Sequence, residues 1–417
     1  MSRPLCIVFL VLFILGGIAA ALNKDIRKGF DELAHVSYVA ALQTNKESWP
    51  RLEQLHMLDP ASFRFTDEAS YLNHTPLYYL LHAHLGPAIE GHPEALIWHR
   101  LLDVGMAAIG LAAALALTFA LGFSRLEFLA YAVPLIATPV LVPLAGAVNN
   151  DNAAFAGGAL ALFAAGRLLT GAGTAWLVVA LIGLVIAAAA KLTGFLLVGG
   201  FLGALFLYLV WRKQMTRRWL VLFVAAFLVA AAPYLAFLVQ YRSLAPETSA
   251  QLAMLQDAAR EMGWAGAPRL SFPAYAINFT TSFVAGWMPT LAPRNAMHHA
   301  MLAIPIAAIT CAIAGSWLAI RRALAGREHP LDVMVVAGFF ALAATFILHI
   351  VFSYERHLAT GWLMDAYPRY YLPMIAIVPL ACIVLLRAVE PRWQPALLAF
   401  LIGGPVVFRL LGGPLGG

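Results

Sequence analysis

The stretch TAWLVVALIGLVIAAAAKLTGFLLVGGFLGALFLYLVW, residues 174–211, decides the class of fold. It contains two apolar runs, 174–190 and 194–211, and each approaches the roughly 20 residues that a helix needs to cross a bilayer. The one charged residue in the stretch is Lys191. Two such runs joined by a short polar turn predict a pair of neighbouring transmembrane helices.

Runs of the same kind fill most of the chain. Of its 417 residues, 62% are hydrophobic and 12% are charged, whereas a soluble protein carries about 25% charged residues. We therefore predict an all-α polytopic membrane protein with about eleven transmembrane helices, which excludes soluble enzymes and DNA-binding domains. The predicted spans are 4–22, 100–121, 127–147, 153–169, 174–190, 194–211, 219–240, 299–320, 331–353, 370–387 and 394–411.

Charged residues orient these helices. With the N-terminus inside, the inner segments carry 12 basic and four acidic residues, and the outer segments carry the remaining 15 basic and 17 acidic residues. Cytoplasmic loops of membrane proteins are rich in Lys and Arg, so the net charge of +6 indicates no nucleic-acid partner. The sequence predicts a multi-pass plasma (inner) membrane protein with a cytoplasmic N-terminus, an extracytoplasmic C-terminus and its chemistry outside.

Two outer segments are long enough to build a site, about 23–99 and about 241–298. The inner connections are short and no separate soluble domain is visible, so residues 1–417 are expected to form a single transmembrane domain. The first run, 4–22, resembles a secretory signal, but we interpret it as a retained helix because it supplies the odd crossing that the charge pattern needs.

The first outer segment opens with FDELAHVSY, residues 30–38. Read as a helix, it places Asp31, His35 and Tyr38 on one stripe, because residues four and seven apart share a face. A carboxylate beside a histidine can act as a general base toward a hydroxyl or hold a metal ion. The alternative is a solvated polar face on an amphipathic helix that lies along the membrane.

The same segment contains NHTPLYYLL, residues 73–81, in which proline favours the first turn of a helix. Asn73 and His74 would then lie in a polar turn at the rim of a cavity, followed by Tyr78. Helix capping and an aromatic belt at the membrane interface explain the same residues without a functional site.

Two polar turns follow at the outer side. In VNNDN, residues 148–152, one residue suffices to cap a helix, so four polar residues favour a functional role for Asn149, Asn150 and Asp151. Lys191 lies in a turn too short to be a hydrated loop, and ionisable groups at membrane depth are usually functional. Snorkelling of the lysine to the interface is the alternative.

The last cluster is DAYPRYYLP, residues 365–373, where the tenth predicted span begins. Arg369 lies there beside aromatic residues such as Tyr370, and a guanidinium offers forked donors that suit phosphate oxygens. Arg100, at the entrance to the second span, has the same possible role, and Arg356 lies in the neighbouring outer loop. An interfacial anchor is the alternative for Arg369 and Arg100, whereas Arg356 could pair locally with Glu355 and His357.

The order of these stretches resembles the GT-C superfamily of glycosyltransferases, and especially its bacterial members related to protein O-mannosyltransferases and lipid A aminoarabinose transferases. Such enzymes move a sugar from a polyprenyl-phosphate carrier to an acceptor on the outer face of the membrane. Thr75 departs from the second proline that is common there, and no counterpart of many relatives' soluble domain is seen. The matching stretches are DELAH (31–35), NHTPLYYLL (73–81), VNNDN (148–152), KLTG (191–194) and RYYLP (369–373).

The resemblance implies a role for each candidate. Asp31 would be the general base, with Glu32 and His35 as its catalytic neighbours. Some relatives use a divalent metal, but no ligand cluster is visible, so no metal residue is predicted and the cofactor stays open. The carrier phosphate would be held by Lys191, Arg369 and Arg100. The cavity would be lined by Asn73, His74, Tyr78, Asn149, Asn150, Asp151, Arg356 and Tyr370.

The sequence thus predicts a membrane glycosyltransferase with a polyprenyl-phosphate sugar as donor, a glycan, lipid or protein as acceptor, and membrane lipids as its surroundings. A transporter or flippase of lipid-linked saccharides is the main alternative, although it would place charges near the membrane midplane. A polysaccharide ligase or polymerase would depend on outer-loop arginines and a histidine more than on Asp31. A purely structural subunit would need neither Asp31 nor Lys191.

Overall fold

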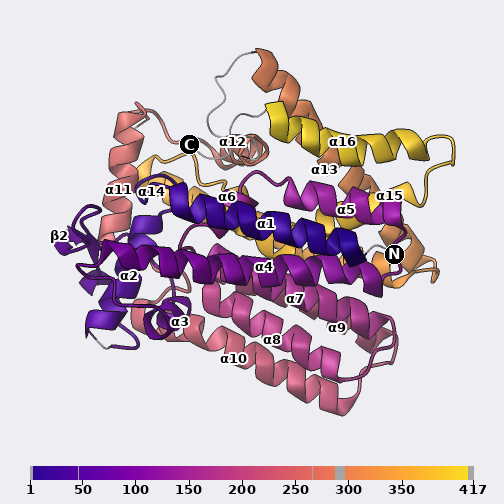
Figure 1. Cartoon of the computed structure of the whole chain (residues 1–417), viewed down its shortest axis with the longest axis horizontal. Coiled ribbons are helices and arrows are strands. Elements are labelled where there is room, and N and C mark those ends of the chain that lie inside the picture. Colours follow the sequence, from indigo (N-terminus) through magenta and orange to yellow (C-terminus); the bar gives the residue numbers. More distant parts are fainter. Residues whose placement is uncertain (1–2, 46, 265, 287–295, 412–417) are drawn as a thin grey trace.

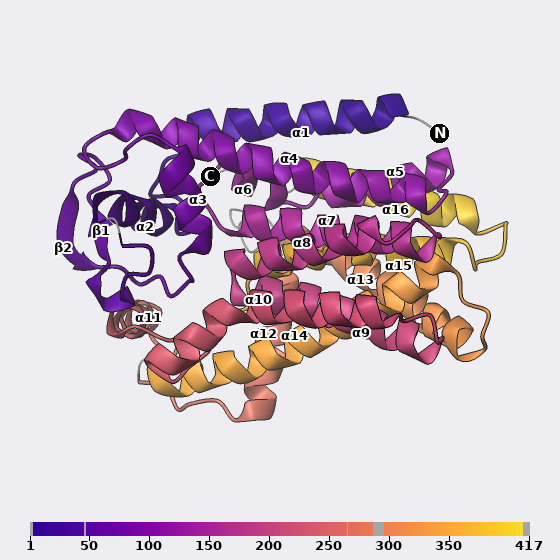
Figure 2. The same cartoon turned by 90° about the horizontal axis from the view of Figure 1, so that it is seen from below.

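The computed structural model describes residues 3–45, 47–264, 266–286 and 296–411, and it shows a bundle of long helices that run side by side (Figure 1). The first outer segment forms a compact group of short elements at one end of this bundle (Figure 2). The helices are α1 (Arg3–Asn23), α2 (Glu32–Asn45), α3 (Leu77–Leu85), α4 (Leu96–Ala120), α5 (Arg125–Ile136), α6 (Leu141–Ala145), α7 (Asp151–Leu169), α8 (Ala175–Ala190), α9 (Leu192–Trp211), α10 (Arg217–Tyr241), α11 (Ser249–Glu261), α12 (Phe272–Ala285), α13 (Ala296–Leu324), α14 (Pro330–Thr360), α15 (Ile377–Leu386) and α16 (Gln394–Leu411). The other elements are the 3₁₀ helices η1 (Leu52–Gln54), η2 (Pro93–Ala95) and η3 (Pro368–Met374) and the strands β1 (His56–Leu58) and β2 (Phe65–Ala69).

Among the described residues, seven helices are long and apolar enough to cross a bilayer, and η3 with α15 adds an eighth crossing if this bent pair is one span. The multi-pass helical fold is therefore confirmed, whereas the predicted count of eleven crossings is not. Helices α8 and α16 are apolar but shorter than a full crossing. The predicted span 127–147 is divided into α5 and α6 near Pro139, because proline removes a backbone donor and disfavours helix continuation.

Small residues bring α7, α8 and η3 together. A Cβ atom on Gly157 would lie 2.6 Å from the backbone nitrogen of Ala187 in α8, so the close approach of these two helices depends on glycine. At Gly158, an added Cβ would collide with the carbonyl group of Pro373 in η3. These contacts hold η3 against α7, and both elements carry candidate site residues.

The first outer segment folds around α2, which is buried along most of its length. The ring of Tyr38 stacks on Tyr79 of α3 with 4.2 Å between centroids, and the Leu58 N–H donates to the Ser37 hydroxyl. The predicted polar face of α2 is thus packed inside the segment. Strands β1 and β2 pair antiparallel, which adds one small two-stranded sheet to the predicted helical fold. That prediction rested on the rule for backbone in lipid, which does not restrict a segment lying outside the bilayer.

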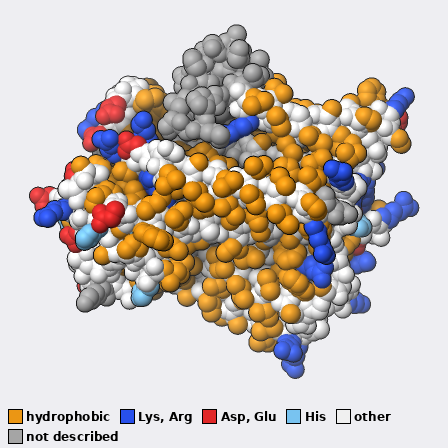
Figure 3. Space-filling model, in the orientation of Figure 1, with side chains coloured by type: hydrophobic (Ala, Val, Ile, Leu, Met, Phe, Trp, Pro, Cys, Tyr) orange, Lys and Arg blue, Asp and Glu red, His pale blue; other side chains and the backbone are white. Residues whose placement is uncertain are grey.

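The surface carries an apolar belt between two charged ends. Figure 3 shows hydrophobic side chains across the middle of the face in view, acidic and basic side chains mixed at the end that includes the first outer segment, and mostly basic side chains at the opposite end. This separation agrees with the charge asymmetry read from the sequence, and it places a bilayer across the long helices.

Candidate active site

A left-handed turn presents Asp31. Gly29, Phe30 and Asp31 have φ angles of +73°, +63° and +57°, and α2 begins only at Glu32. Left-handed backbone costs a residue with a Cβ atom about 1–2 kcal/mol, so surrounding contacts must hold this turn. The prediction that Asp31 lies within the helix beside His35 is therefore wrong, because its backbone turns away before the helix begins.

Four charged side chains meet at this turn, and we call them the charge quartet (Asp31, Arg369, Asp151 and Lys191). Nη2 of Arg369 donates to Oδ2 of Asp31 at 2.5 Å, and Nζ of Lys191 lies 2.5 Å from Oδ1 of Asp151. Nε of Arg369 and Oδ2 of Asp151 lie 3.7 Å apart, and both are buried without a hydrogen-bond partner among the described residues. The quartet is balanced in charge, yet it keeps unused donor and acceptor capacity.

Aromatic rings surround the two cations of the quartet. Nζ of Lys191 lies 4.0 Å from the centroid of the Tyr370 ring, and the Arg369 guanidinium lies 5.5 Å from the same centroid. Phe30 and Tyr367 contact Arg369 in the same way, at 5.8 and 5.4 Å. Ring faces stabilise a cation that has lost its water.

Asp31 is the solvent-facing member of the quartet. Its side chain is 42% exposed, compared with 12% for Arg369, 5% for Lys191 and 1% for Asp151. The hydroxyl of Tyr71 lies 3.4 Å from Oδ1 of Asp31 and was not predicted as a site residue. A molecule that approaches from solvent therefore meets this carboxylate before it meets the buried cations.

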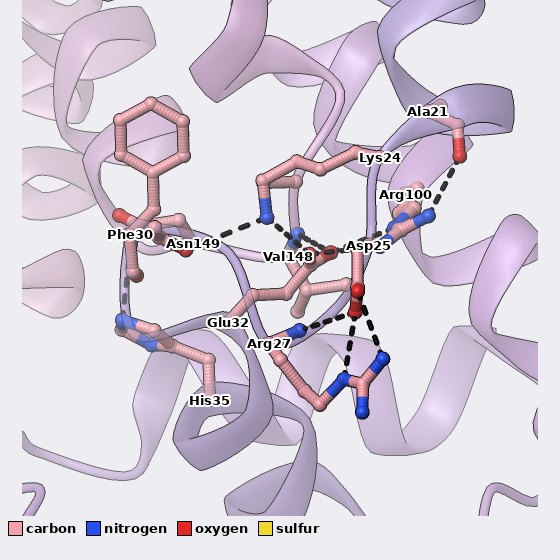
Figure 4. Close-up of polar contacts among 12 residues, drawn as sticks. Ala21, Lys24, Asp25, Arg27, Phe30, Glu32, His35, Arg100, Val148 and Asn149 are labelled. Atoms are coloured by element: carbon pink, nitrogen blue, oxygen red, sulfur yellow. Dashed lines mark hydrogen bonds and ion pairs between the residues drawn. The ribbon is translucent and has the colours of Figure 1, made fainter. Parts of the chain in front are cut away.

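Glu32, the next residue, is buried and fully paired (Figure 4). Its carboxylate accepts from Nζ of Lys24 at 2.6 Å, from Nε and Nη2 of Arg100 at 2.7 and 2.8 Å, and from the Val148 N–H at 3.0 Å. Nη1 of Arg100 donates to the Ala21 carbonyl at 2.8 Å. Glu32 thus ties α1, α4 and the turn before α7 to the start of α2. The structure places Arg100 in this junction and not in the quartet.

His35 supports the turn from inside α2. The Asn149 amide donates to the Phe30 carbonyl at 2.7 Å and to Nε2 of His35 at 3.0 Å. Nε2 must therefore accept, which leaves Nδ1 to donate to the Tyr79 hydroxyl at 2.9 Å. Burial, followed by the charge of His74, lowers the pKa of His35 well below its ordinary value. His35 is a neutral, fully bonded ring that positions the turn.

His74 lies beside the quartet and is partly exposed. Its ring stacks on His35 with 5.9 Å between centroids. Burial, followed by the positive charge of Lys191, lowers the pKa of His74 to about 3. At neutral pH this side chain is uncharged, so it lines the site without competing for an anion.

Three predicted cavity residues are engaged in backbone or interior contacts. The Asn73 amide donates to the Pro246 carbonyl at 2.9 Å, which joins the two outer segments. The Asn150 amide donates to the Ala190 carbonyl at 2.9 Å, beside Lys191. The Tyr78 hydroxyl donates to Oδ2 of a buried aspartate in α4 at 2.8 Å.

Arg356 forms a separate cluster at the outer end of α14. Its Nε donates to Glu247 at 2.6 Å, and its Nη1 lies 3.3 Å from the buried carboxylate of Asp365. Arg356 therefore links the second outer segment to the loop before η3. It is not part of the quartet, whereas Arg369 is a member and Tyr370 packs against it.

Asp103 is a buried residue that the sequence reading missed. It accepts from the Tyr78 hydroxyl and, at 3.3 Å, from the Asn149 N–H, and Nε2 of His82 lies 3.5 Å from it. A carboxylate inside an apolar span could itself have indicated a functional residue, because ionisable residues are rare there and usually have a role. Lys24 and Tyr71 carried no such signal, because they lie in a segment without helical periodicity.

Within the described part of the chain, no group of three His, Cys, Asp or Glu side chains is arranged to hold a metal ion. Both carboxylates of the quartet face a cation instead. The arrangement can accept a proton at its exposed acid and hold an anion at its buried cations.

Comparisons with known proteins place the fold. No family model matches the sequence, and no curated protein matches it. A crystal structure of ArnT from Cupriavidus metallidurans bound to undecaprenyl phosphate is similar over 98% of this chain, with a TM-score of 0.51 and 15% sequence identity. The match covers 64% of the ArnT chain, so this protein spans less than two thirds of it. The apo form of the same protein matches 85% of this chain and 77% of its own, at 14% identity and a TM-score of 0.36. This chain therefore has the fold of that ArnT structure, as far as the likeness extends.

Proposed function

We propose that this protein is an integral-membrane glycosyltransferase that moves a sugar from a polyprenyl-phosphate carrier to an acceptor hydroxyl at the outer face of the inner membrane. The observation that carries the proposal is the charge quartet, in which an exposed carboxylate lies against two buried cations. The ArnT structure of similar fold holds undecaprenyl phosphate, which supports a lipid phosphate as the donor carrier.

The proposed reaction begins with the acceptor at Asp31. One carboxylate oxygen takes the hydroxyl proton while the acceptor oxygen attacks the anomeric carbon, and the bond between that carbon and the phosphate oxygen breaks. The leaving carrier phosphate gains one negative charge. Lys191 and Arg369 would stabilise this charge, and they would act strongly because both side chains are buried.

Arg369 would change partner during this step. In the structure its guanidinium binds Asp31, so a donor phosphate competes with that carboxylate. When Asp31 takes the proton it becomes neutral, and Arg369 is released just as the phosphate gains charge. Its Nε, which has no hydrogen-bond partner within the described ranges, supplies a further donor, so Arg369 could bind the phosphate in a bidentate manner beside Lys191.

Glu32, Arg100 and His35 would act as positioning residues. Glu32 and Arg100 fasten the elements around the turn, and Asn149 with His35 holds the Phe30 carbonyl inside it. They would keep Asp31 in its left-handed conformation without touching substrate.

The domain organisation, the orientation and the acceptor class that we propose are those expected from the sequence. Residues 1–417 act as one unit, with the outer segments about 23–99 and 241–298 covering the site and the N-terminus in the cytoplasm. The acceptor is a glycan, a lipid or a protein. The relation to protein O-mannosyltransferases stays a prediction.

The test is a transfer assay with the purified protein in detergent, using a polyprenyl phosphate that carries a radiolabelled sugar and a panel of acceptors. The proposal predicts a covalently labelled acceptor and release of polyprenyl phosphate. A flippase moves its substrate without forming a covalent bond, and detergent leaves no compartments to move it between. It would therefore give no labelled acceptor. If the protein binds the donor without forming product, and moves the donor across the membrane of reconstituted vesicles, it is a transporter and the proposal is wrong.

A further inference from the structure

A polar cavity lies at the opposite end of the bundle from the charge quartet. It has a volume of about 410 Å³ and lies among the ends of α7 and α9 and the starts of α10 and α14. In Figure 2 the ends of α9 and α10 that border it are on the right, away from the first outer segment. Its apolar wall includes Leu168, Leu205 and Val333, and its polar wall includes Tyr208, Trp219 and Glu328.

Glu328 is the unusual member of this wall. Its side chain is 4% exposed, and its Oε1 accepts from the Tyr208 hydroxyl at 3.1 Å and lies 3.5 Å from Nη2 of Arg212. The other oxygen, Oε2, is buried and has no hydrogen-bond partner in the described part of the chain. A buried charged oxygen without a partner is costly, and native proteins rarely leave one.

The other acids at this end do not share this feature. Glu127 and Asp332 each bind an arginine through one oxygen and a backbone N–H through the other. Glu390 pairs with an arginine at 2.8 Å, and its side chain is 66% exposed to solvent. Glu328 has the longest of these ion pairs, at 3.5 Å, and a free oxygen beside a cavity. The cavity therefore suits a ligand that brings a cationic hydrogen-bond donor.

We propose that this cavity binds the headgroup of an ethanolamine phospholipid. The primary ammonium donates to Oε2 of Glu328, and the phosphate lies beside Arg212, whose side chain is 43% exposed. The leucine and valine wall receives the apolar part of the lipid. A headgroup belongs at this depth, because the cavity lies where the apolar helices end in a basic rim.

Other small ligands fit less well. Ca²⁺ and Mg²⁺ require about six oxygen ligands, and much of this wall is leucine and valine. A purely anionic headgroup would meet the Glu328 carboxylate. A zwitterion with its ammonium inside and its phosphate toward the basic rim satisfies both charges.

The test measures which phospholipid stays bound to purified protein. Wild-type protein is reconstituted in bilayers of equal phosphatidylethanolamine and phosphatidylcholine, extracted again, washed with detergent, and its retained lipid is quantified by mass spectrometry. We expect about tenfold enrichment of phosphatidylethanolamine, the scale of one charge-assisted hydrogen bond. Glu328→Gln should abolish the enrichment, whereas Glu390→Gln, which removes an exposed charge at the same end, should keep it.

Equal retention of both lipids by the wild type, or undiminished enrichment in Glu328→Gln, would overturn the proposal. If Glu328→Gln does not fold, the wild-type protein still tests the proposal. Its retention is then measured for a series of phospholipids whose ethanolamine nitrogen carries zero to three methyl groups. Retention should fall as methyl groups replace N–H donors, and a flat series would contradict an ammonium bound to Glu328. No sugar transfer is measured, so the result does not depend on the proposed reaction.

Discussion

At the scale of single residues, burial separates two neighbouring acids into different roles. Asp31 and Glu32 are adjacent in the sequence, yet the first is 42% exposed at its side chain and the second is 1% exposed. Glu32 has two basic partners and a backbone donor, whereas Asp31 has one ion-pair partner and the Tyr71 hydroxyl. A proton acceptor must be reachable by the acceptor hydroxyl, so Asp31 fits that role and Glu32 does not.

His74 gives a prediction for pH dependence. Its pKa is about 3 in the folded protein and ordinarily 6.5, so between these values the unfolded chain binds a proton that the folded chain does not. The free energy of unfolding must therefore fall as the pH is lowered from 6.5 toward 3, by less than about 1.4 kcal/mol per pH unit for this partly exposed group. Melting temperatures in detergent at pH 7 and pH 5 should show a smaller drop for His74→Gln than for the wild type. Identical drops in both proteins would show that His74 is not held neutral by the fold.

At the scale of elements, Glu32 and Arg100 join helices that lie far apart in the sequence. Glu32→Gln should destabilise the fold by about 3–5 kcal/mol, because it leaves Arg100 buried without its partner. Arg100→Gln should destabilise it similarly, and the double variant should lose less than the two single losses combined. Thermal unfolding and the KM for donor check this, with the donor KM of the double variant expected near the wild-type value. If Arg100→Gln raises the donor KM but leaves the stability unchanged, Arg100 binds the donor phosphate, as the sequence predicted.

The contact between α7 and η3 gives a second prediction. Gly158→Ala should push η3 away from α7, because the added methyl group meets the Pro373 carbonyl. Overpacking of this kind costs about 1–3 kcal/mol, and it displaces the element that carries Arg369. We expect a lower melting temperature and a higher donor KM. Gly203→Ala in α9 is the matched control, since its Cβ would enter open space, and it should leave both quantities unchanged. If both substitutions change the melting temperature and the donor KM equally, displacement of η3 is not the cause of the change.

Most elements could be predicted, but the local geometry of the site could not. The length and composition of the apolar runs predicted the long helices, because a helix that crosses the bilayer must be long enough and apolar enough to do so. The left-handed conformation of Phe30 and Asp31 leaves no trace in composition, so Asp31 was placed within a helix. Arg100 was assigned to phosphate because its partner Glu32 lies 68 positions away, and pairing at that distance depends on tertiary structure. Lys191, Asp151 and Arg369 were all selected from the sequence, and the structure brings them together.

At the scale of the whole molecule, charge is sorted to the two ends of an apolar belt (Figure 3). The quartet and the first outer segment occupy one end, and the basic rim with its cavity occupies the other. Lys and Arg are retained in the cytoplasm during insertion, which predicts that the quartet faces outward.

Cysteine labelling tests this orientation. In a background with Cys6, Cys311 and Cys382 replaced by alanine, single cysteines are placed at Met364 and at Gln214. A membrane-impermeant maleimide added to intact spheroplasts should label Met364→Cys at once and Gln214→Cys only after permeabilisation. The reverse pattern would place the quartet in the cytoplasm.

The central claim is that Asp31 takes the acceptor proton while it shares Arg369 with the donor phosphate. The most direct measurement is sugar transfer by purified Asp31→Asn at saturating donor, with binding of polyprenyl phosphate measured on the same preparation. We predict that transfer falls at least about a hundredfold while polyprenyl phosphate binds more tightly than in the wild type, because Arg369 loses its competing carboxylate. Arg369→Ala should weaken that binding. Transfer near the wild-type rate by folded Asp31→Asn would contradict the account.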